Sequence, residues 1–206
     1  IAPVAGTRTR LHQQILHRKK DGIEGLFTVL GVKYTTARDV AERTMNKVLK
    51  KLDRFDASVS KLSVTPLPGG DIGDFKGFAG EAKAGAPKEL SEACVTNLLY
   101  TYGTEYKKVL DQAGTDKALL EPVGGSSSVI AAEIIYAVRE EMAQTLSDVV
   151  FRRTDLGAMG VPDDKTLNAC AGFMARELSW DKARVEKEVS DLKSFVQNVL
   201  TRVFRE

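Results

Sequence analysis

Apolar residues recur every three or four positions in five successive segments beyond about residue 88. This spacing places them along one face of an α-helix, so each segment predicts an amphipathic helix that must bury that face. The predicted helices cover 90–102, 104–112, 126–153, 163–178 and 179–203, the third capped by Ser126, Ser127 or Ser128, the fourth by Asp163 or Asp164, and the last by Ser179. The sequence therefore predicts a mainly α chain with a five-helix, bundle-like domain over residues 88–206.

A different pattern occupies the first part of the chain. Residues 26–30 form a β-branched and aromatic run bounded by Gly25 and Gly31, which predicts a buried strand. A lone buried strand needs hydrogen-bonding neighbours, and we expect these to lie outside this sequence. A helix with Val40 and Leu52 near its two ends follows, capped by Thr35 or Thr36. Residues 1–55 are thus interpreted as a strand-turn-helix remnant of an α/β domain, in a chain cut from a larger protein.

Glycine and proline are concentrated between these two parts. Residues 56–87 include Pro66, Pro68 and several glycines, a composition that argues against regular secondary structure. A loop of this length is commonly a linker between units. We therefore expect residues 1–55, 56–87 and 88–206 to form a remnant, a linker and a helical domain.

Composition excludes several classes of function. The 30 basic and 28 acidic residues give a net charge of +2, which offers no electrostatic reason to expect nucleic acid. The two cysteines are far apart and the chain has two histidines, so we expect no metal site, and buried thiols suit a cytoplasmic location. No apolar run is long enough to span a bilayer. A search for catalytic motifs finds no nucleophile triad, phosphate loop or Gly-x-Gly-x-x-Gly turn.

Two polar segments are open to more than one interpretation. The corner from Gly31 to Arg38 follows the predicted strand and opens a helix, which suits a phosphate, a carboxylate or a flavin edge beside Lys33. A capped helix with one solvated lysine explains the same residues, and from the residues alone it is somewhat favoured. Between Tyr136 and Thr154, Asp148 and Arg152 stand four residues apart and could pair. That segment is interpreted either as a polar seam holding a neighbouring domain or as a solvated charged face.

These segments resemble the FAD-dependent glycerol-3-phosphate dehydrogenases. The run Gly-Leu-Phe-Thr-Val-Leu-Gly-Val-Lys-Tyr-Thr-Thr-Ala-Arg from Gly25 is similar to the last strand and turn of that family. The segment 136–157, with Arg-Glu-Glu-Met-Ala and Arg-Arg-Thr, resembles the hallmark of the family's C-terminal helical domain. Leu-Pro-Gly-Gly at 67–70, Tyr-Thr-Tyr-Gly at 100–103 and Leu-Ser-Trp-Asp at 178–181 also match, so the resemblance covers nearly the whole chain in order.

The resemblance implies roles for individual residues. Lys33 matches the family lysine beside the flavin and the substrate, and Thr35 and Gly31 match residues lining the flavin. Arg8, in Ala-Gly-Thr-Arg, less closely resembles the arginine that grips the substrate phosphate. There are departures, because Val32 replaces the second glycine of the turn, Thr9 the proline after the arginine, and Ala37 a common tyrosine. A side chain at position 32 would hinder a close backbone approach to the flavin.

The implied parent enzyme oxidises sn-glycerol 3-phosphate to dihydroxyacetone phosphate and passes electrons through FAD to quinone. Its partners are the rest of the parent flavoenzyme and the inner face of the cytoplasmic membrane, where peripheral association is an open alternative to a purely cytoplasmic state. This fragment is expected to be an inactive structural and interaction domain that binds no FAD alone. Two alternatives remain: the glycerol-3-phosphate oxidase branch of the family, and a free-standing helical protein-interaction module.

Overall fold

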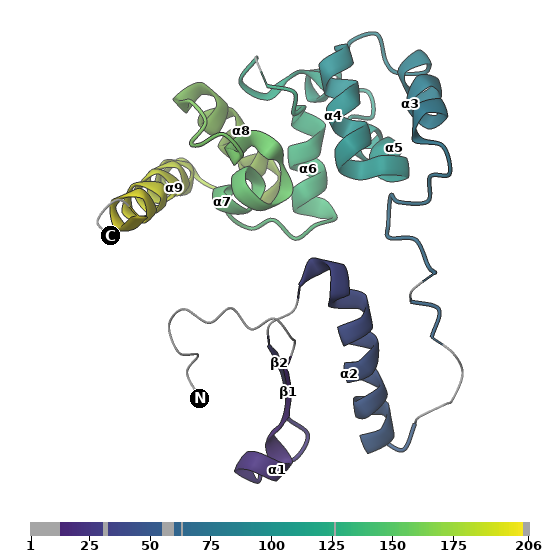
Figure 1. Cartoon of the computed structure of the whole chain (residues 1–206). Coiled ribbons are helices and arrows are strands. Elements are labelled where there is room, and N and C mark those ends of the chain that lie inside the picture. The colour runs from purple at the N-terminus through teal and green to yellow at the C-terminus, as the bar shows by residue number, and fades with distance from the viewer. Residues whose placement is uncertain (1–12, 31–32, 55–59, 63, 126, 204–206) are drawn as a thin grey trace. The chain divides into compact units, whose positions relative to one another are not determined.

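The computed structural model describes residues 13–30, 33–54, 60–62, 64–125 and 127–203, and Figure 1 traces their elements. The chain divides into two compact units, Ile1–Thr65 and Pro66–Glu206. The mainly helical character predicted from the sequence is confirmed. Each unit is described by itself.

The first unit contains a β-hairpin. Strand β1 (Gln13–Leu16) pairs antiparallel with β2 (Phe27–Leu30), and helix α1 (His17–Asp21) lies between them. The expectation that the strand over residues 26–30 has no neighbour in this chain is therefore wrong. It failed because Gln-Gln-Ile-Leu carries a weak strand signal beside a basic run.

The hairpin is only partly sheltered. Among the described residues the sheet has two strands, β1 and β2. The side chains of Phe27, Thr28 and Val29 are half-buried, and Leu30 is exposed. The imidazole of His17 bridges the hairpin, with Nδ1 2.5 Å from a carboxylate oxygen of Asp21 and Nε2 2.8 Å from the Thr28 hydroxyl. Side-chain bonding thus compensates for a small apolar interface.

Helix α2 (Ala37–Lys51) follows the short 3₁₀ turn η1 (Tyr34–Thr36), which confirms the predicted helix. Its apolar face is scarcely covered. Among the described residues of this unit Val40 is buried, whereas Met45 and Leu52 are more than half exposed. The described part of the first unit therefore has very little apolar core.

The elements described in the second unit are helices and helical turns (Figure 1). Its elements are α3 (Phe75–Ala84), α4 (Glu92–Tyr102), η2 (Gly103–Glu105), α5 (Tyr106–Asp111), η3 (Lys117–Leu120), η4 (Val123–Gly125), α6 (Ala131–Arg139), α7 (Leu146–Asp148), the π-helical turn η5 (Val149–Arg153), η6 (Asp155–Gly157), α8 (Asp164–Leu178) and α9 (Lys182–Val203).

Helix α3 lies in a stretch that the sequence predicts to be irregular, so that part of the expectation is wrong. The Asp74 carboxylate starts the helix by accepting the backbone N–H groups of Lys76 and Gly77, each at 3.0 Å. Ala82 is then buried, and Phe78 packs against the same cluster. Capping and burial together outweigh the weak helix preference of the glycines.

The long helix predicted over 126–153 is broken. Helix α6 ends at Arg139, and Met142 adopts a left-handed φ of 59°. The chain then restarts at α7, because the Thr145 hydroxyl accepts the N–H of Asp148 while the Asp148 carboxylate accepts the N–H of Thr145. A reciprocal cap of this kind begins a new helix rather than continuing an old one.

The junction of the last two helices also differs from the prediction. Asp163 caps α8 as predicted, accepting the N–H of Thr166 at 2.7 Å. Ser179, predicted to cap the last helix, instead ends α8 with a left-handed φ of 54°. The carboxylate of Asp181 accepts the N–H of Arg184 at 2.7 Å and takes the capping role.

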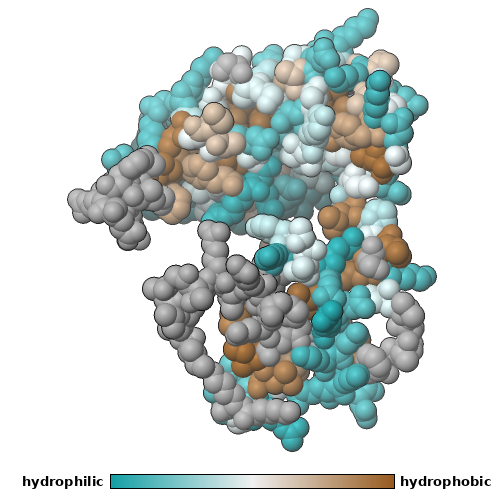
Figure 2. Space-filling view, viewed as in Figure 1, coloured by the Kyte–Doolittle hydropathy of each residue, from teal (hydrophilic) through white to brown (hydrophobic). Residues whose placement is uncertain are grey.

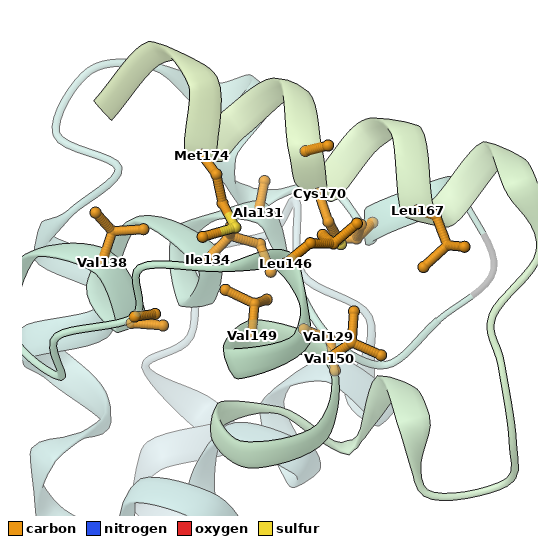
Figure 3. Close-up of a cluster of buried hydrophobic side chains, with 14 of the residues drawn as sticks. Val129, Ala131, Ile134, Val138, Leu146, Val149, Val150, Leu167, Cys170 and Met174 are labelled. Atoms are coloured by element: carbon orange, nitrogen blue, oxygen red, sulfur yellow. The ribbon is translucent and has the colours of Figure 1, made fainter. Parts of the chain in front are cut away.

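Two apolar clusters form the core of the second unit. The first gathers side chains from α6, α7, η5, α8 and α9, including those in Figure 3. The second gathers Phe78, Cys94, Leu98 and Val109 with other residues of α3, α4 and α5. Helix α6 supplies Ile134 to the first cluster and Ala132 to the second. Figure 2 shows the polar residues interspersed with apolar ones over the visible surface of the unit.

Candidate functional site

The corner after β2 carries the residues predicted to contact a cofactor. Arg8 and Gly31 lie outside the described residues. Lys33 and Thr35 are both exposed, on either side of Tyr34, which is fully exposed. The carbonyl of Lys33 accepts the N–H of Thr36 at 3.0 Å and its hydroxyl at 3.2 Å. The backbone of the turn is thus fixed by hydrogen bonds, while the side chains of Lys33 and Thr35 are exposed.

The electrostatics of this corner favour an anion. Among the described residues, no carboxylate lies within ion-pair distance of the Lys33 ammonium group. The backbone N–H groups at the start of a helix add partial positive charge to that of the lysine. Carboxylates, phosphates and electron-rich ring edges all suit such a corner.

Arg38, the last residue of the same motif, has a structural contact. Its Nη2 donates to the carbonyl of Thr65, at the end of the first unit. The described part of this motif, residues 33–38, therefore combines exposed polar side chains with an arginine that is hydrogen-bonded to the backbone at Thr65.

The segment Tyr136–Gly157 is held together by its own polar groups. Arg139 grips Glu177 of α8 with two parallel bonds, Nε to Oε2 at 2.6 Å and Nη2 to Oε1 at 2.8 Å. The predicted pair of Asp148 and Arg152 is confirmed, with Nη1 and Oδ1 2.5 Å apart. Both contacts lie inside the second unit, so these residues brace that unit.

Asp148 shows how the segment is stabilised. Burial opposes the charge of its carboxylate, but hydrogen bonds from the Thr145 hydroxyl, from two backbone N–H groups and from Arg152 outweigh burial and hold its pKa below the usual range. A carboxylate that accepts several bonds at a helix start is a strong cap.

A buried carboxylate on α6 was missed by the sequence reasoning. Glu133 is completely buried, and its Oε1 accepts the N–H of Ile130 at 2.9 Å. The amide of Asn97 on α4 lies 3.4 Å from Oε2, a long contact. Burial raises the pKa of Glu133 to about 7 despite these donors, and burial followed by the nearby Glu133 charge raises the pKa of the Tyr102 hydroxyl. A glutamate three residues after a predicted helix start is the signal that could have revealed it.

In the ranges that the structure describes, no three His, Cys, Asp or Glu side chains gather as metal ligands. Cys94 and Cys170 are buried free thiols, and burial raises the pKa of Cys170 to about 12. None of the described helices combines the length and apolar character needed to cross a bilayer.

A known family model matches the part of the chain that holds the polar segment Tyr136–Gly157. The model of the C-terminal domain of alpha-glycerophosphate oxidase matches residues 61–185, more than half of the chain. The chain belongs to this family. The match runs from the end of the first unit to the first turn of α9, and so includes the broken helix and the hallmark segment.

Relatives in several bacteria extend the similarity to the rest of the chain. A glycerol-3-phosphate dehydrogenase of Synechocystis is 29% identical over 94% of this chain and 34% of its own length. The aerobic glycerol-3-phosphate dehydrogenase of Bacillus subtilis is 28% identical over 95% of this chain and 38% of its own. That of Escherichia coli is 32% identical over 67% of this chain and 27% of its own. The chain thus spans about a third of the length of these relatives.

Proposed function

We propose that this member of the alpha-glycerophosphate oxidase family is the C-terminal part of an FAD-dependent glycerol-3-phosphate dehydrogenase. The parent enzyme oxidises sn-glycerol 3-phosphate to dihydroxyacetone phosphate and passes the electrons to quinone. The observation that carries the proposal is the family match over residues 61–185. The names of the relatives, which match most of this chain, support the substrate.

The state of the first unit supports the rest of the flavoenzyme as partner. Val40 is the buried apolar side chain among its described residues, while Ile23, Leu26 and Leu30 on the hairpin are each close to half exposed. So little burial leaves a unit without enough hydrophobic stabilisation to offset its conformational entropy. The remaining two thirds of the parent enzyme would cover these side chains.

The residues of the corner fit one side of a flavin site by their chemistry. Lys33 supplies a cation without a carboxylate neighbour among the described residues, and Thr35 supplies an exposed hydroxyl. When bound, FAD would accept the hydride from the substrate. Lys33 would stabilise negative charge on the reduced ring and Thr35, with Gly31, would line it. Arg8 would bind the substrate phosphate through its guanidinium fork.

The second unit has a bracing role in this proposal. Its polar hallmark residues, Arg139 and Asp148 among them, bond to partners within the unit. The isolated chain is then colourless and inactive, and the parent is cytoplasmic with the alternative of peripheral membrane association. A remnant at 1–55, a linker at 56–87 and a helical domain at 88–206 remain the proposed biological division.

The decisive experiment replaces Lys33 in the full-length enzyme. We expect Lys33→Met to lower turnover of glycerol 3-phosphate about 100-fold, because one preorganised charge is removed from the site of developing negative charge. It should also lower the reduction potential of the bound flavin, whereas Lys33→Arg restores part of both. Lys88→Met, at an exposed loop position, is the control. Unchanged turnover and potential in Lys33→Met would exclude the proposed role.

A second candidate function is that of a glycerol-3-phosphate oxidase, because the matching family model is named for an oxidase. Peroxide release from the intact enzyme under air, measured beside quinone reduction, separates the two. Dominant peroxide release would replace the dehydrogenase assignment. Flavin absorbance in the purified 206-residue chain would instead contradict its dependence on the rest of the enzyme.

A further inference from the structure

Two polar side-chain atoms in the described part of the second unit are buried without a hydrogen-bond partner. They are the hydroxyl oxygen of Tyr102, on α4, and Oε2 of Glu141, in the turn after α6. An unpaired buried polar atom is costly, so most such atoms in proteins have a partner. The charge of Glu141 acts on Tyr102, which places the two groups in the same region of the unit.

Tyr102 also lies beside a second carboxylate. The side chain of Glu133 is completely buried on α6, and its charge acts on Tyr102 more strongly than that of Glu141 does. Glu133 accepts the N–H of Ile130 at 2.9 Å, whereas the amide of Asn97 is a distant donor at 3.4 Å. Each carboxylate can therefore accept a further donor, but the Tyr102 hydroxyl has a single hydrogen to give.

The protonation of Glu133 decides which carboxylate receives that hydrogen. Burial raises the pKa of Glu133 to about 7, so both of its forms are present near neutral pH. The ionised form accepts a hydrogen bond from Tyr102. The neutral acid instead donates its own hydrogen to the Tyr102 oxygen, and the Tyr102 hydrogen then turns to Glu141. Burial, followed by the charge of Glu133, raises the pKa of Tyr102, so the phenol keeps its proton in both states.

The turn that carries Glu141 is sensitive to such a change. Glu141 precedes Met142, whose φ of 59° is left-handed, and the N–H of Ala143 closes the turn on the carbonyl of Ala137 at 2.9 Å. Glycine usually occupies the left-handed position of such a turn, because a side chain there adds strain. A bond gained or lost at Glu141 therefore acts on a turn that is already strained.

We propose that Tyr102 is a hydrogen-bond switch between the buried carboxylates of Glu133 and Glu141. Its hydroxyl bonds to Glu133 when that side chain is ionised and to Glu141 when it is neutral, and the turn at Met142 changes with it. The switch lies within the second unit, goes beyond the proposed function and does not depend on it. The other charged groups that act on this cluster are Asp155 on Glu133, Arg153 on Glu141, and Glu105, Lys108 and Glu140 on the neighbouring ring of Tyr136.

The test follows the methionine methyl signals of the whole 206-residue chain by NMR. The pH series crosses the titration of Glu133, from about pH 5.5 to 8.5. Met142 is 82% exposed, and we expect its methyl shift to change with a midpoint of about 7, together with the carboxyl carbon signal of Glu133. Met159, which is fully exposed, is the internal control and should show no such midpoint.

Tyr102→Phe removes the hydroxyl alone and separates a switch from a direct effect of charge. In this variant the change at Met142 should disappear. The midpoint of Glu133 itself should rise by about one pH unit, because the ionised form loses a donor. Tyr100→Phe, at an exposed position on the same helix, should leave both signals unchanged.

A second pair of variants measures the coupling in both directions. Glu141→Gln should shift the midpoint of Glu133, and Glu133→Gln should shift that of Glu141 by the same amount, because linkage is reciprocal. Both shifts should be largely lost when Tyr102→Phe is added, whereas Glu140→Gln, at an exposed neighbour, should cause neither. Coupling that survives Tyr102→Phe in full would overturn the proposal. So would a Met142 signal that does not follow Glu133 in the unmodified chain, a result that needs no variant to fold.

Discussion

Replacing Glu133 by glutamine tests whether its buried carboxylate makes the helical unit lose stability as the pH rises. Glutamine keeps the shape and an oxygen that can accept the N–H of Ile130, which the carboxylate accepts at 2.9 Å. It cannot ionise. The variant therefore removes the titration of this side chain while preserving the cap on α6.

The size of the effect follows from the environment of the side chain. Burial raises the pKa of Glu133 to about 7 from its ordinary 4.5. Between these values the folded chain holds a proton that the unfolded chain has lost, so the free energy of unfolding falls as the pH rises. The contribution is fully present below about 4.5 and is lost as the pH passes 7, a total of about 3 kcal/mol at roughly 1.4 kcal/mol per pH unit.

The assay is urea unfolding at a series of pH values from about 4.5 to 8, across the titration of the buried carboxyl. It is followed by the fluorescence of Trp180, which packs against the first cluster. The difference between Glu133→Gln and the unmodified chain isolates this one group, and we expect the variant to gain relative stability as the pH rises. Glu81→Gln, at an exposed position on α3, is the matched control. A pH-independent difference for Glu133→Gln would refute the reasoning.

Three further predictions concern packing and caps. Gly124→Ala should destabilise the unit by about 3 kcal/mol, because its Cβ would lie 2.1 Å from a side-chain oxygen of α8 at a φ of 71°; Gly114→Ala, with positive φ but nothing within 4 Å, should cost about 1 kcal/mol, and equal losses in thermal unfolding would contradict the steric explanation. Met174→Ala should cost about 3 kcal/mol by leaving a cavity in the first cluster, whereas Met159→Ala, at a fully exposed methionine, should change the denaturation midpoint little. Asp148→Asn should lower the free energy of unfolding by about 1 kcal/mol at pH 7. Hydrogen bonds hold the pKa of Asp148 below its ordinary value of 3.8, so the stability that the carboxylate contributes is present above pH 3.8 and is lost as the pH falls through the lower pKa of the folded chain. If the variant remained less stable than the unmodified chain by the same amount at the most acidic pH, the capping role would be contradicted.

The regular helices could be predicted from the sequence because each combines an apolar repeat of three to four residues with residues that cap or end a helix. The predicted range 90–102 corresponds to α4, whose Ser91 cap and terminal Gly103 stand on either side of the apolar stripe. Asp163 and α8 follow the same rule. Local propensity and burial agree in these elements, so either alone leads to the same answer.

The breaks were not readable because they depend on contacts between distant residues. The apolar period continues through residues 139–146, yet the chain turns at Met142 and restarts on the Thr145 cap. The N–H of Leu146 donates to Glu188 of α9 at 2.8 Å, a partner 42 residues away. The sequence near Leu146 does not include Glu188, so a local pattern could not predict this contact.

The candidate site was only partly accessible for a related reason. Lys33 and Thr35 could be singled out because a strand-to-helix corner is a local pattern, and the structure describes both as exposed. Their proposed roles depend on a cofactor and on protein segments that this sequence does not include. The structural contact of Arg38 was hidden because its acceptor is a backbone carbonyl, which any residue at position 65 would provide.

The sharing of α6 between two cores has a practical consequence for anyone who wishes to trim this protein. A shortened version that keeps α6 but omits α3–α5 would expose Ala132 and its neighbours to water, and one that omits α8 and α9 would expose Ile134. Either half would expose an apolar surface through which its copies would associate, and it would precipitate during expression. We therefore expect the helical unit to fold and to be expressed in stable form only as one piece.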